Sequence, residues 1–196
     1  MLSTNLKVPV TRLITPLCRA LISMGITANM VTVFGALGSI AASIIFIAQG
    51  KYLAGVLITT VLILSDLLDG TMARLTNGGT KWGAVLDSTL DRITDAVLIL
   101  SLAYHLHNID DGLLPIAIIA MVLSLLVPYI RARAEALGIP CNVGVAERTE
   151  RLVILLVGIG LAGLGLPYSL AVSVWLLALL SLVTVFQRLN AVRKFA

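Results

Sequence analysis

Four aspartates set at short, regular spacings are the residues of this chain best suited to chemistry. Asp66 and Asp69 lie three residues apart, and Asp87 and Asp91 lie four apart. Because residues three and four apart share one face of a helix, each pair is expected to project from one side of its own helix. The chain is 59% hydrophobic and only 12% charged, so carboxylates in these apolar segments need a positive partner. A bound divalent metal ion is the simplest such partner.

The sequence between the two pairs predicts how they meet. Asn77-Gly78-Gly79 is a turn signal, and a turn here folds the two helices into an antiparallel pair whose carboxylates converge. A set of ligands made only of carboxylate oxygens suits a hard cation such as Mg2+ or Mn2+, and four carboxylates suffice for two ions. Two ions held in this way are typical of phosphoryl-transfer sites.

The wider pattern around the aspartates resembles the signature of the CDP-alcohol phosphatidyltransferases, which are membrane enzymes that transfer a substituted phosphate from a CDP-linked lipid or alcohol to an acceptor hydroxyl. All eight specified positions are filled over 26 residues, as Asp66-x2-Asp69-Gly70-x2-Ala73-Arg74-x8-Gly83-x3-Asp87-x3-Asp91. The resemblance implies that the four aspartates are metal ligands and that Asp91 is also the catalytic general base. Asp95, one turn further on, is interpreted as a partner for Arg92 or for another helix rather than as a ligand.

The same resemblance implies a binding site for the CDP-lipid. Small residues at Gly70 and Ala73 allow a base or a phosphate to approach the backbone, although close helix packing explains them equally well. Arg74 is expected to pair with the pyrophosphate or with a neighbouring carboxylate, or simply to extend towards the membrane surface. Asn29 stands where family members often carry an acidic residue, and its amide still offers hydrogen bonds to cytosine or ribose. The implied contacts are Asn29, Met30, Val31, Thr32, Gly70, Ala73, Arg74, Thr80 and Gly83.

Three basic segments later in the chain resemble the actinobacterial branch of the family, which makes phosphatidylinositol phosphate. They are Arg131-Ala-Arg-Ala-Glu135, Glu147-Arg-Thr-Glu-Arg151 and Gln187-Arg-Leu189. The resemblance implies that Arg131, Arg151 and Arg188 bind the phosphate of the acceptor, inositol 1-phosphate. Arg131 replaces a lysine of that branch, which retains the charge and adds a planar fork of donors. Ordinary positive flanks of membrane spans explain the other basic residues here, Arg133, Arg148, Arg193 and Lys194.

Composition predicts the elements that position these residues. A length of 196 residues and a mean hydropathy of +1.04 place one domain, 1–196, in a bilayer. We expect an all-α polytopic membrane protein, in which residues 1–25 form an N-terminal interfacial amphipathic helix and 26–196 form a bundle of six transmembrane helices. The expected spans are about 30–49, 52–75, 82–107, 112–137, 146–165 and 168–190. Thr27-Ala28-Asn29 caps the first of them, and Cys18 and Cys141 are interpreted as small apolar residues.

The distribution of positive charge predicts the orientation. Six spans put both termini on one side of the membrane. Of the 14 Lys and Arg residues, 13 then fall in the half of the protein on that side, and Lys51 alone lies in the opposite half. By the positive-inside rule, both termini and the aspartates lie on the cytoplasmic side of the plasma membrane. The net charge of +4 is therefore explained by the membrane, and no nucleic-acid partner is expected.

The resemblance implies a homodimeric enzyme, surrounded by membrane lipids, that transfers the phosphatidyl group of CDP-diacylglycerol to inositol 1-phosphate and releases CMP. Phosphatidylglycerophosphate synthase, with glycerol 3-phosphate as acceptor, is the alternative within the family. Free inositol as acceptor would leave three basic residues without an anion. From another class, a small cation or proton transporter fits intramembrane aspartates, but the sequence has no discontinuous helix pair or internal repeat. A structural scaffold would leave the carboxylates uncompensated.

Overall fold

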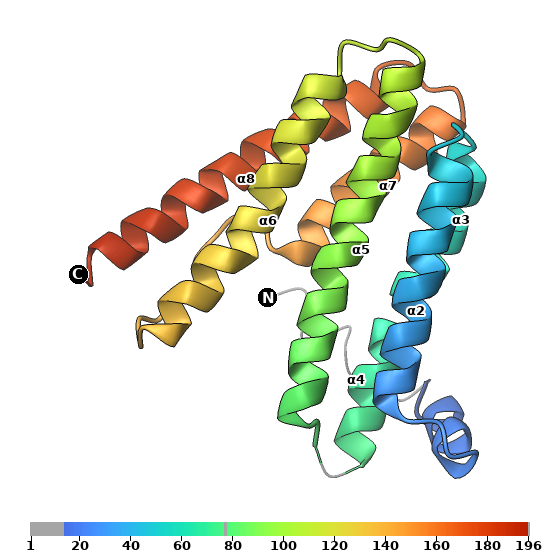
Figure 1. The fold of residues 1–196 in the computed structure, drawn as a ribbon, viewed down its shortest axis with the longest axis vertical. Coiled ribbons are helices and arrows are strands. Elements are labelled where there is room, and N and C mark those ends of the chain that lie inside the picture. Colours follow the sequence, from blue (N-terminus) through green and yellow to red (C-terminus); the bar gives the residue numbers. More distant parts are fainter. Residues whose placement is uncertain (1–13, 77, 196) are drawn as a thin grey trace. The chain divides into compact units, whose positions relative to one another are not determined.

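The chain folds into helices joined by short connections (Figure 1). The structure, a computed structural model, describes residues 14–76 and 78–195, and within these ranges there is no strand. A helix over Ile14–Ser23 comes first. It is followed by α2 (Ala28–Ala42), the π-helix η1 (Ser43–Ile47), α3 (Tyr52–Ile63), α4 (Asp66–Leu75), α5 (Lys81–Asn108), α6 (Leu114–Ala136), α7 (Arg148–Gly163) and α8 (Ser169–Arg193).

Four helical stretches in the described part of the chain are long and apolar enough to cross a membrane. They are Ala28–Ile47, Tyr52–Leu75, Leu114–Ala136 and Ser169–Arg193. The all-α membrane class predicted from composition is therefore confirmed. Helices α5 and α7 fall where the third and fifth spans were expected, but the first half of α5 is rich in charged residues and α7 has only 16 residues. The count of six spans stays a prediction.

The predicted interfacial helix is described only in its second half. Its residues 1–13 lie outside the described residues, whereas Ile14–Ser23 is helical. Within this helix Cys18 is fully buried, and its Sγ lies 3.7 Å from the carbonyl oxygen of Leu68. Cys141 is buried as well, and neither cysteine is in a disulfide. Both side chains thus behave as the small apolar residues predicted from the sequence.

The structure divides into two compact units. The first takes in the chain up to Ala42 together with Ile58–Thr94, and the second takes in Ser43–Leu57 and the chain from Asp95 onwards. Helices α3 and α5 contribute residues to both. The prediction of a single domain over 1–196 stays a prediction.

The first unit is organised by the packing of α2 against α4. The span expected over 52–75 is interrupted by a turn at Leu64 and Ser65, so that α4 begins at Asp66. Gly35 of α2 meets this turn closely: a side chain there would collide with Ser65 Oγ and lie 3.2 Å from the carbonyl oxygen of Leu62. The absence of a side chain at Gly35 therefore lets the two helices approach each other.

The turn predicted between the two aspartate pairs is present. Gly78 has a φ of +85°, which glycine adopts without strain. Its N–H donates to the carbonyl of Ala73 at 3.0 Å, a bond that closes the end of a helix. At the start of α5, the hydroxyl of Thr80 accepts from the N–H of Gly83 at 2.9 Å. The chain reverses here, and α4 and the first turns of α5 run in opposite directions (Figure 1).

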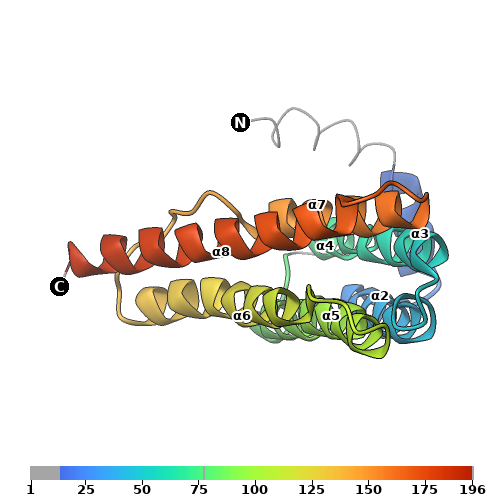
Figure 2. The ribbon, with the colours of Figure 1, turned by 90° about the horizontal axis from the view of Figure 1, so that it is seen from above.

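In the second unit, α8 packs along both α6 and α7 (Figure 2). Gly158 of α7 allows this approach, because a side chain there would collide with Ser173 of α8. Buried serines lie between α6 and α8, where the hydroxyls of Ser124 and Ser181 are 3.5 Å apart. The core of the unit is therefore partly polar, as is common where helices meet inside a membrane.

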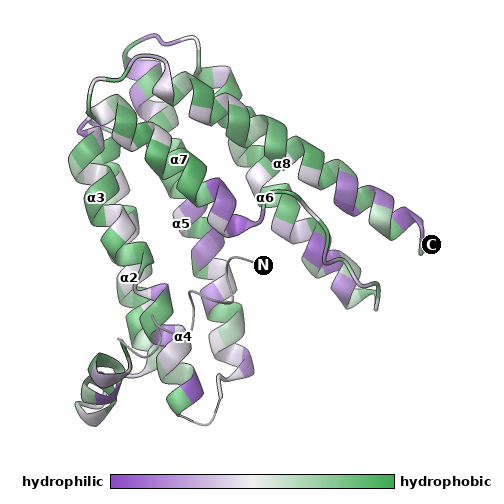
Figure 3. Cartoon of the chain, turned by 180° about the vertical axis from the view of Figure 1, so that it is seen from behind, coloured by the Kyte–Doolittle hydropathy of each residue, from purple (hydrophilic) through white to green (hydrophobic). Residues whose placement is uncertain are grey.

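Hydrophobic residues make up much of the length of the helices (Figure 3). Phe34 is 75% exposed on α2, and Phe186 is 64% exposed on α8. Exposed apolar surface on this scale fits contact with lipid. Hydrophilic residues gather instead in the last turns of α6 and α8 (Figure 3), as expected for spans whose ends reach a polar interface.

Candidate functional site

A cavity of about 450 Å³ lies in the first unit, lined by α2, α4 and the beginning of α5. This volume is within the range of roughly 300 to 1,000 Å³ that is usual for small-molecule sites. Two aspartates and several small residues form its wall. The lining residues are Thr27, Ala28, Asn29, Thr32, Asp69, Gly70, Ala73, Thr76, Gly78, Gly79, Thr80, Gly83, Ala84 and Asp87.

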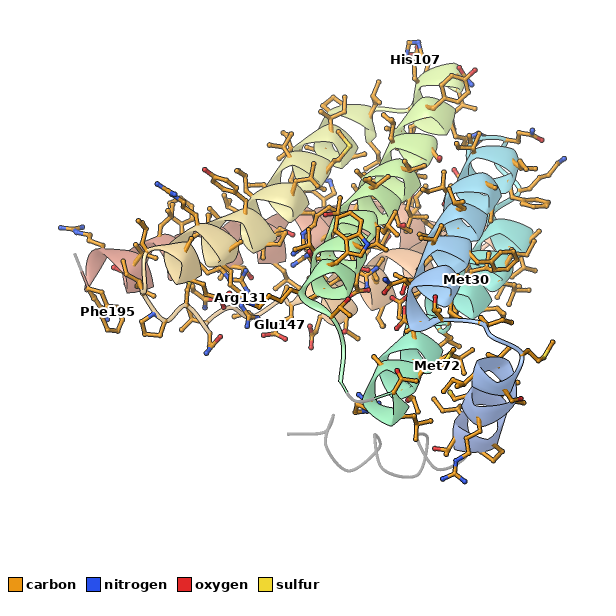
Figure 4. The ribbon with its side chains drawn as sticks, turned by 60° about the horizontal axis from the view of Figure 1, so that its bottom comes forward. Met30, Met72, His107, Arg131, Glu147 and Phe195 are labelled. Carbon is orange, nitrogen blue, oxygen red and sulfur yellow. The ribbon has the colours of Figure 1, made fainter. Side chains whose placement is uncertain are left out.

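Most of the residues expected to contact a CDP-lipid line this cavity. They are Asn29, Thr32, Gly70, Ala73, Thr80 and Gly83. Met30 and Val31 are not part of the lining, and Met30 is 56% exposed on α2 (Figure 4). Helical periodicity explains this difference, because Asn29 and Thr32 lie three residues apart on one face while the residues between them turn away.

The two signature glycines of the cavity wall, Gly83 and Gly70, differ in the space around them. A side chain at Gly83 would lie 2.9 Å from Oδ1 of Asn29 and 3.2 Å from Oγ1 of Thr80. The start of α5 thus approaches α2 at a point where only a glycine leaves space. Gly70 is less crowded, since the nearest atom to a side chain there would be Arg74 Nη1 at 3.9 Å.

Arg74 does not line the cavity, but its guanidinium lies against the Gly70 face of α4. Its Nη2 donates to the hydroxyl of Thr71 at 3.0 Å. The side chain is exposed, so the guanidinium retains donors for an anion. Of the three alternatives from the sequence, which also include pairing with a neighbouring carboxylate, a pyrophosphate contact and a surface-directed arginine both fit this position.

The two aspartates of the wall come from opposite sides of the predicted turn. Asp69 is only 7% exposed, and its Oδ2 accepts a hydrogen bond from Thr32 Oγ1 at 2.6 Å. The charges of Asp66 and Asp87 both act on the Asp69 carboxylate. A nearly buried carboxylate that has two negative neighbours, and whose hydrogen-bond partners are the neutral Thr32 hydroxyl and the backbone of Gly70, is an environment that favours a bound cation.

These oxygens fit a hard divalent ion in their chemistry. Among the described residues, however, no three His, Cys, Asp or Glu side chains are gathered closely enough to hold a metal. Asp69 and Asp87 face the cavity, whereas Asp66 and Asp91 are not in its lining. The metal site of four aspartates therefore stays a prediction, which the placement of Asp69 and Asp87 supports.

The arginines expected at the acceptor lie in the second unit, and two of them are buried. Arg151 is 6% exposed, and its Nη1 donates to the carbonyl of Ala146 at 3.0 Å. Arg188 is 3% exposed; its Nε donates to the carbonyl of Val143 at 2.9 Å and its Nη1 to that of Val127. Both arginines therefore use part of their donors to bind the backbone of this unit.

Arg131 is more accessible. Its side chain is 42% exposed and pairs with Glu135 one turn later, with Nε and Oε1 2.8 Å apart. Its charge also interacts with those of Glu147 and Arg188. Arg131 and Arg188 thus share one electrostatic environment, as expected of two residues that would bind one phosphate.

Residues 137–147, which connect α6 to α7 and are here called the strap loop, are fastened by α8. Gln187 Oε1 accepts from the N–H of Val145 at 3.0 Å, and Thr184 Oγ1 accepts from that of Ala146 at 3.1 Å. Gly144 has a φ of +140°, and a side chain there would lie 2.6 Å from Thr184 Cγ2. Sequence reasoning missed these contacts, although a glycine in the middle of the loop was a signal of a close approach.

Asp95 has the partner predicted on another helix. Its Oδ1 lies 3.4 Å from Nε of Arg148, in the first turn of α7. Arg92, the other partner considered, donates to the carbonyl of Ser88 on its own helix. Arg148, interpreted from the sequence as an ordinary positive flank, is thus also part of an ion pair.

Some lining residues had no signal in the sequence as site residues. The sequence predicts Thr27 only as a helix cap, and its hydroxyl does accept from the N–H of Met30 at 3.3 Å. Ala28 and Ala84 have no polar group in their side chains, and the hydroxyl of Thr76 donates to the carbonyl of Met72 in its own helix at 2.9 Å. They line the cavity because of where their helices begin and end.

Comparison with known proteins gives consistent results. The family model for CDP-alcohol phosphatidyltransferase matches residues 25–187. A Mycobacterium tuberculosis protein named phosphatidylinositol phosphate synthase is 40% identical over 186 residues, which covers 92% of this chain and 86% of that protein. A Corynebacterium glutamicum protein of the same name is 35% identical, over 96% of this chain and 88% of that protein.

Two solved structures of phosphatidylinositol phosphate synthase from Mycobacterium tuberculosis are also similar to this chain. One, in complex with manganese and citrate, has a TM-score of 0.89 and 39% identity, and the match covers 92% of this chain and 88% of that one. The other, with CDP-DAG bound, has a TM-score of 0.88 and 40% identity, over 92% and 94% of the two chains.

Proposed function

Because this chain belongs to the CDP-alcohol phosphatidyltransferase family, we propose that it is a phosphatidylinositol phosphate synthase. It transfers the phosphatidyl group of CDP-diacylglycerol to inositol 1-phosphate and releases CMP. The observation that carries this proposal is the 40% identity over 92% of the chain to a protein of that name. The cavity lined by Asp69, Asp87 and the small residues of the signature supports it independently.

The cavity of the first unit is the binding site for the nucleotide part of CDP-diacylglycerol. Asn29 and Thr80 offer hydrogen-bonding groups at its wall, and Gly70 and Gly83 provide space. Arg74 is placed against the Gly70 face, where its free donors suit a pyrophosphate. A relative of known structure binds CDP-DAG, which supports this assignment.

Asp66, Asp69, Asp87 and Asp91 would hold one or two divalent ions, Mg2+ or Mn2+. Their donor atoms are all oxygens, as these ions prefer, and a relative of known structure contains manganese. Such ions would neutralise the pyrophosphate and stabilise the negative charge on departing CMP.

Asp91 acts as the general base. It takes the proton of the acceptor hydroxyl while the hydroxyl oxygen forms a bond to the phosphorus nearest the lipid, and the bond from that phosphorus to CMP breaks. The reaction needs no covalent intermediate with the enzyme. A carboxylate is a weak base, so most of the rate comes from holding the acceptor and the donor in position.

Arg131, Arg151 and Arg188 bind the phosphate of the acceptor. A guanidinium carries five N–H donors, and two of those of Arg188 bind the backbone carbonyls of Val143 and Val127. The remaining donors are held in place by those contacts. The same arginines suit glycerol 3-phosphate, which is the acceptor in phosphatidylglycerophosphate synthase and the alternative within the family.

The enzyme works in the plasma membrane, as a homodimer, with its termini and its active site on the cytoplasmic side. The positive-inside rule supports this orientation, since 13 of the 14 basic residues then lie in the cytoplasmic half. The exposed apolar surface of the helices supports insertion in lipid.

The acceptor is tested by CMP release. Purified protein in detergent, supplied with CDP-diacylglycerol and Mg2+, is expected to release CMP with inositol 1-phosphate at a rate at least about tenfold higher than with free inositol, because the arginines would lack an anion in the latter case. Faster turnover with glycerol 3-phosphate than with inositol 1-phosphate would give the alternative acceptor instead. Ion flux in vesicles without CDP-diacylglycerol, and no CMP from any acceptor, would favour the transporter.

The nucleotide site is tested by Gly83→Ala. The added methyl group would meet the Asn29 amide at 2.9 Å, so we expect Asn29 to be displaced and the KM for CDP-diacylglycerol to rise roughly tenfold. Steady-state CMP release measures this. Gly112→Ala is the matched control, because nothing lies within 4 Å of a side chain there. An unchanged KM in Gly83→Ala would contradict the assignment of this cavity.

A further inference from the structure

Thr32 contacts a predicted metal ligand directly. Its Oγ1 lies 2.6 Å from Oδ2 of Asp69 and 3.0 Å from the carbonyl oxygen of Ala28, one turn earlier on α2. A hydroxyl has one proton to donate. The shorter distance, to an acceptor that carries a charge, assigns that proton to Asp69.

The hydroxyl of Thr32 is held in this position by the packing around it. Thr32 and Asp69 are each 7% exposed, so little of either side chain is open to water that would compete for their hydrogen bond. A β-branched threonine has few side-chain conformations in a helix, and α2 itself packs against α4, which carries Asp69. Gly35, three residues after Thr32, meets Ser65 at the start of α4, and this close contact fixes the register of the two helices.

We propose that Thr32 is a positioning residue for the divalent metal, acting by fixing the orientation of the Asp69 carboxylate. This inference rests on the proposed function, but it gives Thr32 a different role from the nucleotide contact expected from the family resemblance. A carboxylate can accept at about four positions, so the bond from Thr32 leaves Asp69 capacity for a metal. Metal-binding carboxylates are commonly oriented by such hydrogen bonds.

The test compares the binding of Mn2+ to the full chain in detergent, without CDP-diacylglycerol, by electron paramagnetic resonance of free Mn2+. Thr32→Val retains the shape of the side chain and removes the hydroxyl, and Thr32→Ser retains the hydroxyl. We expect Thr32→Val to bind Mn2+ at least about tenfold more weakly than the natural chain, and Thr32→Ser to bind it within about threefold. Thr32→Ala, a second variant without the hydroxyl, is measured beside them, and thermal unfolding checks that each variant is folded.

The outcomes of these measurements separate this inference from the proposed function. If Thr32→Val and Thr32→Ala bind Mn2+ as the natural chain does, or if Thr32→Ser is as weak as they are, the positioning role is wrong. A raised KM for CDP-diacylglycerol at saturating Mn2+, with unchanged Mn2+ binding, would assign Thr32 to the nucleotide instead. CMP release by the natural chain tests the proposed function by itself; a natural chain that releases no CMP and binds no Mn2+ overturns both.

Discussion

Replacing Asp91 with Asn is expected to lower CMP release by at least about 100-fold, which is the lower end of the usual contribution of a general base. The amide is close to the carboxylate in shape, but it cannot take the proton of the acceptor hydroxyl, and it is a poorer ligand for a divalent ion. Single-turnover CMP release with saturating CDP-diacylglycerol, acceptor and Mg2+ measures the effect on the chemical step.

Asp110→Asn is the matched control for this substitution. Asp110 is exposed and has a φ of +53°, a conformation that Asn adopts readily. The control removes one negative charge without a change of backbone, so its rate is expected to stay within about twofold of the natural chain, as for surface substitutions generally. A rate in Asp91→Asn close to that of Asp110→Asn would exclude Asp91 as the base.

Arg188→Lys is expected to reduce both stability and acceptor binding. The guanidinium of Arg188 bridges the carbonyls of Val127 and Val143, and a single ammonium group cannot reproduce that planar fork. At least one of the two contacts is then lost, and a hydrogen bond to a charged group contributes roughly 1.5 to 3 kcal/mol. Fewer oriented donors also remain for the acceptor phosphate, so the KM for inositol 1-phosphate is expected to rise by about tenfold or more.

Thermal unfolding in detergent and steady-state CMP release separate the two effects. Arg193→Lys is the control, because Arg193 lies in the same helix but is not buried, and neither quantity is expected to change. A loss of stability with an unchanged KM would limit Arg188 to holding the strap loop. An unchanged stability would contradict the two backbone contacts themselves.

The outline of the fold follows from hydropathy alone. The helices α2, α6 and α8 lie close to the spans expected over 30–49, 112–137 and 168–190. Each of these segments is a long apolar run, which is the pattern that predicts a membrane-spanning helix. The turn at Gly78 was also predictable, since glycine there adopts a positive φ. By contrast, the break between α3 and α4 and the π-helix η1 interrupt apolar runs that carry no glycine or proline at those points, so composition did not indicate them.

The site was predictable where side chains have distinctive chemistry. The aspartate signature led to Asp69, Asp87 and Gly83, and the cavity contains all three. The hydrogen bond from Thr32 to Asp69 joins residues 37 positions apart, and no local pattern predicts such a contact. Met30 is exposed because consecutive residues of α2 point to different sides of the helix. The family motif implies contacts for four consecutive residues, 29–32, and does not distinguish which of them face the cavity.

The strap loop has a consequence for the affinity of the proposed acceptor site. An arginine side chain loses about 2 kcal/mol of rotamer entropy when it is immobilised, and a flexible arginine would lose it each time a ligand bound. Arg188 is already immobilised when the chain folds, by the carbonyls of Val127 and Val143. Preorganisation of this kind raises affinity for a small, strongly hydrated anion without adding a single contact.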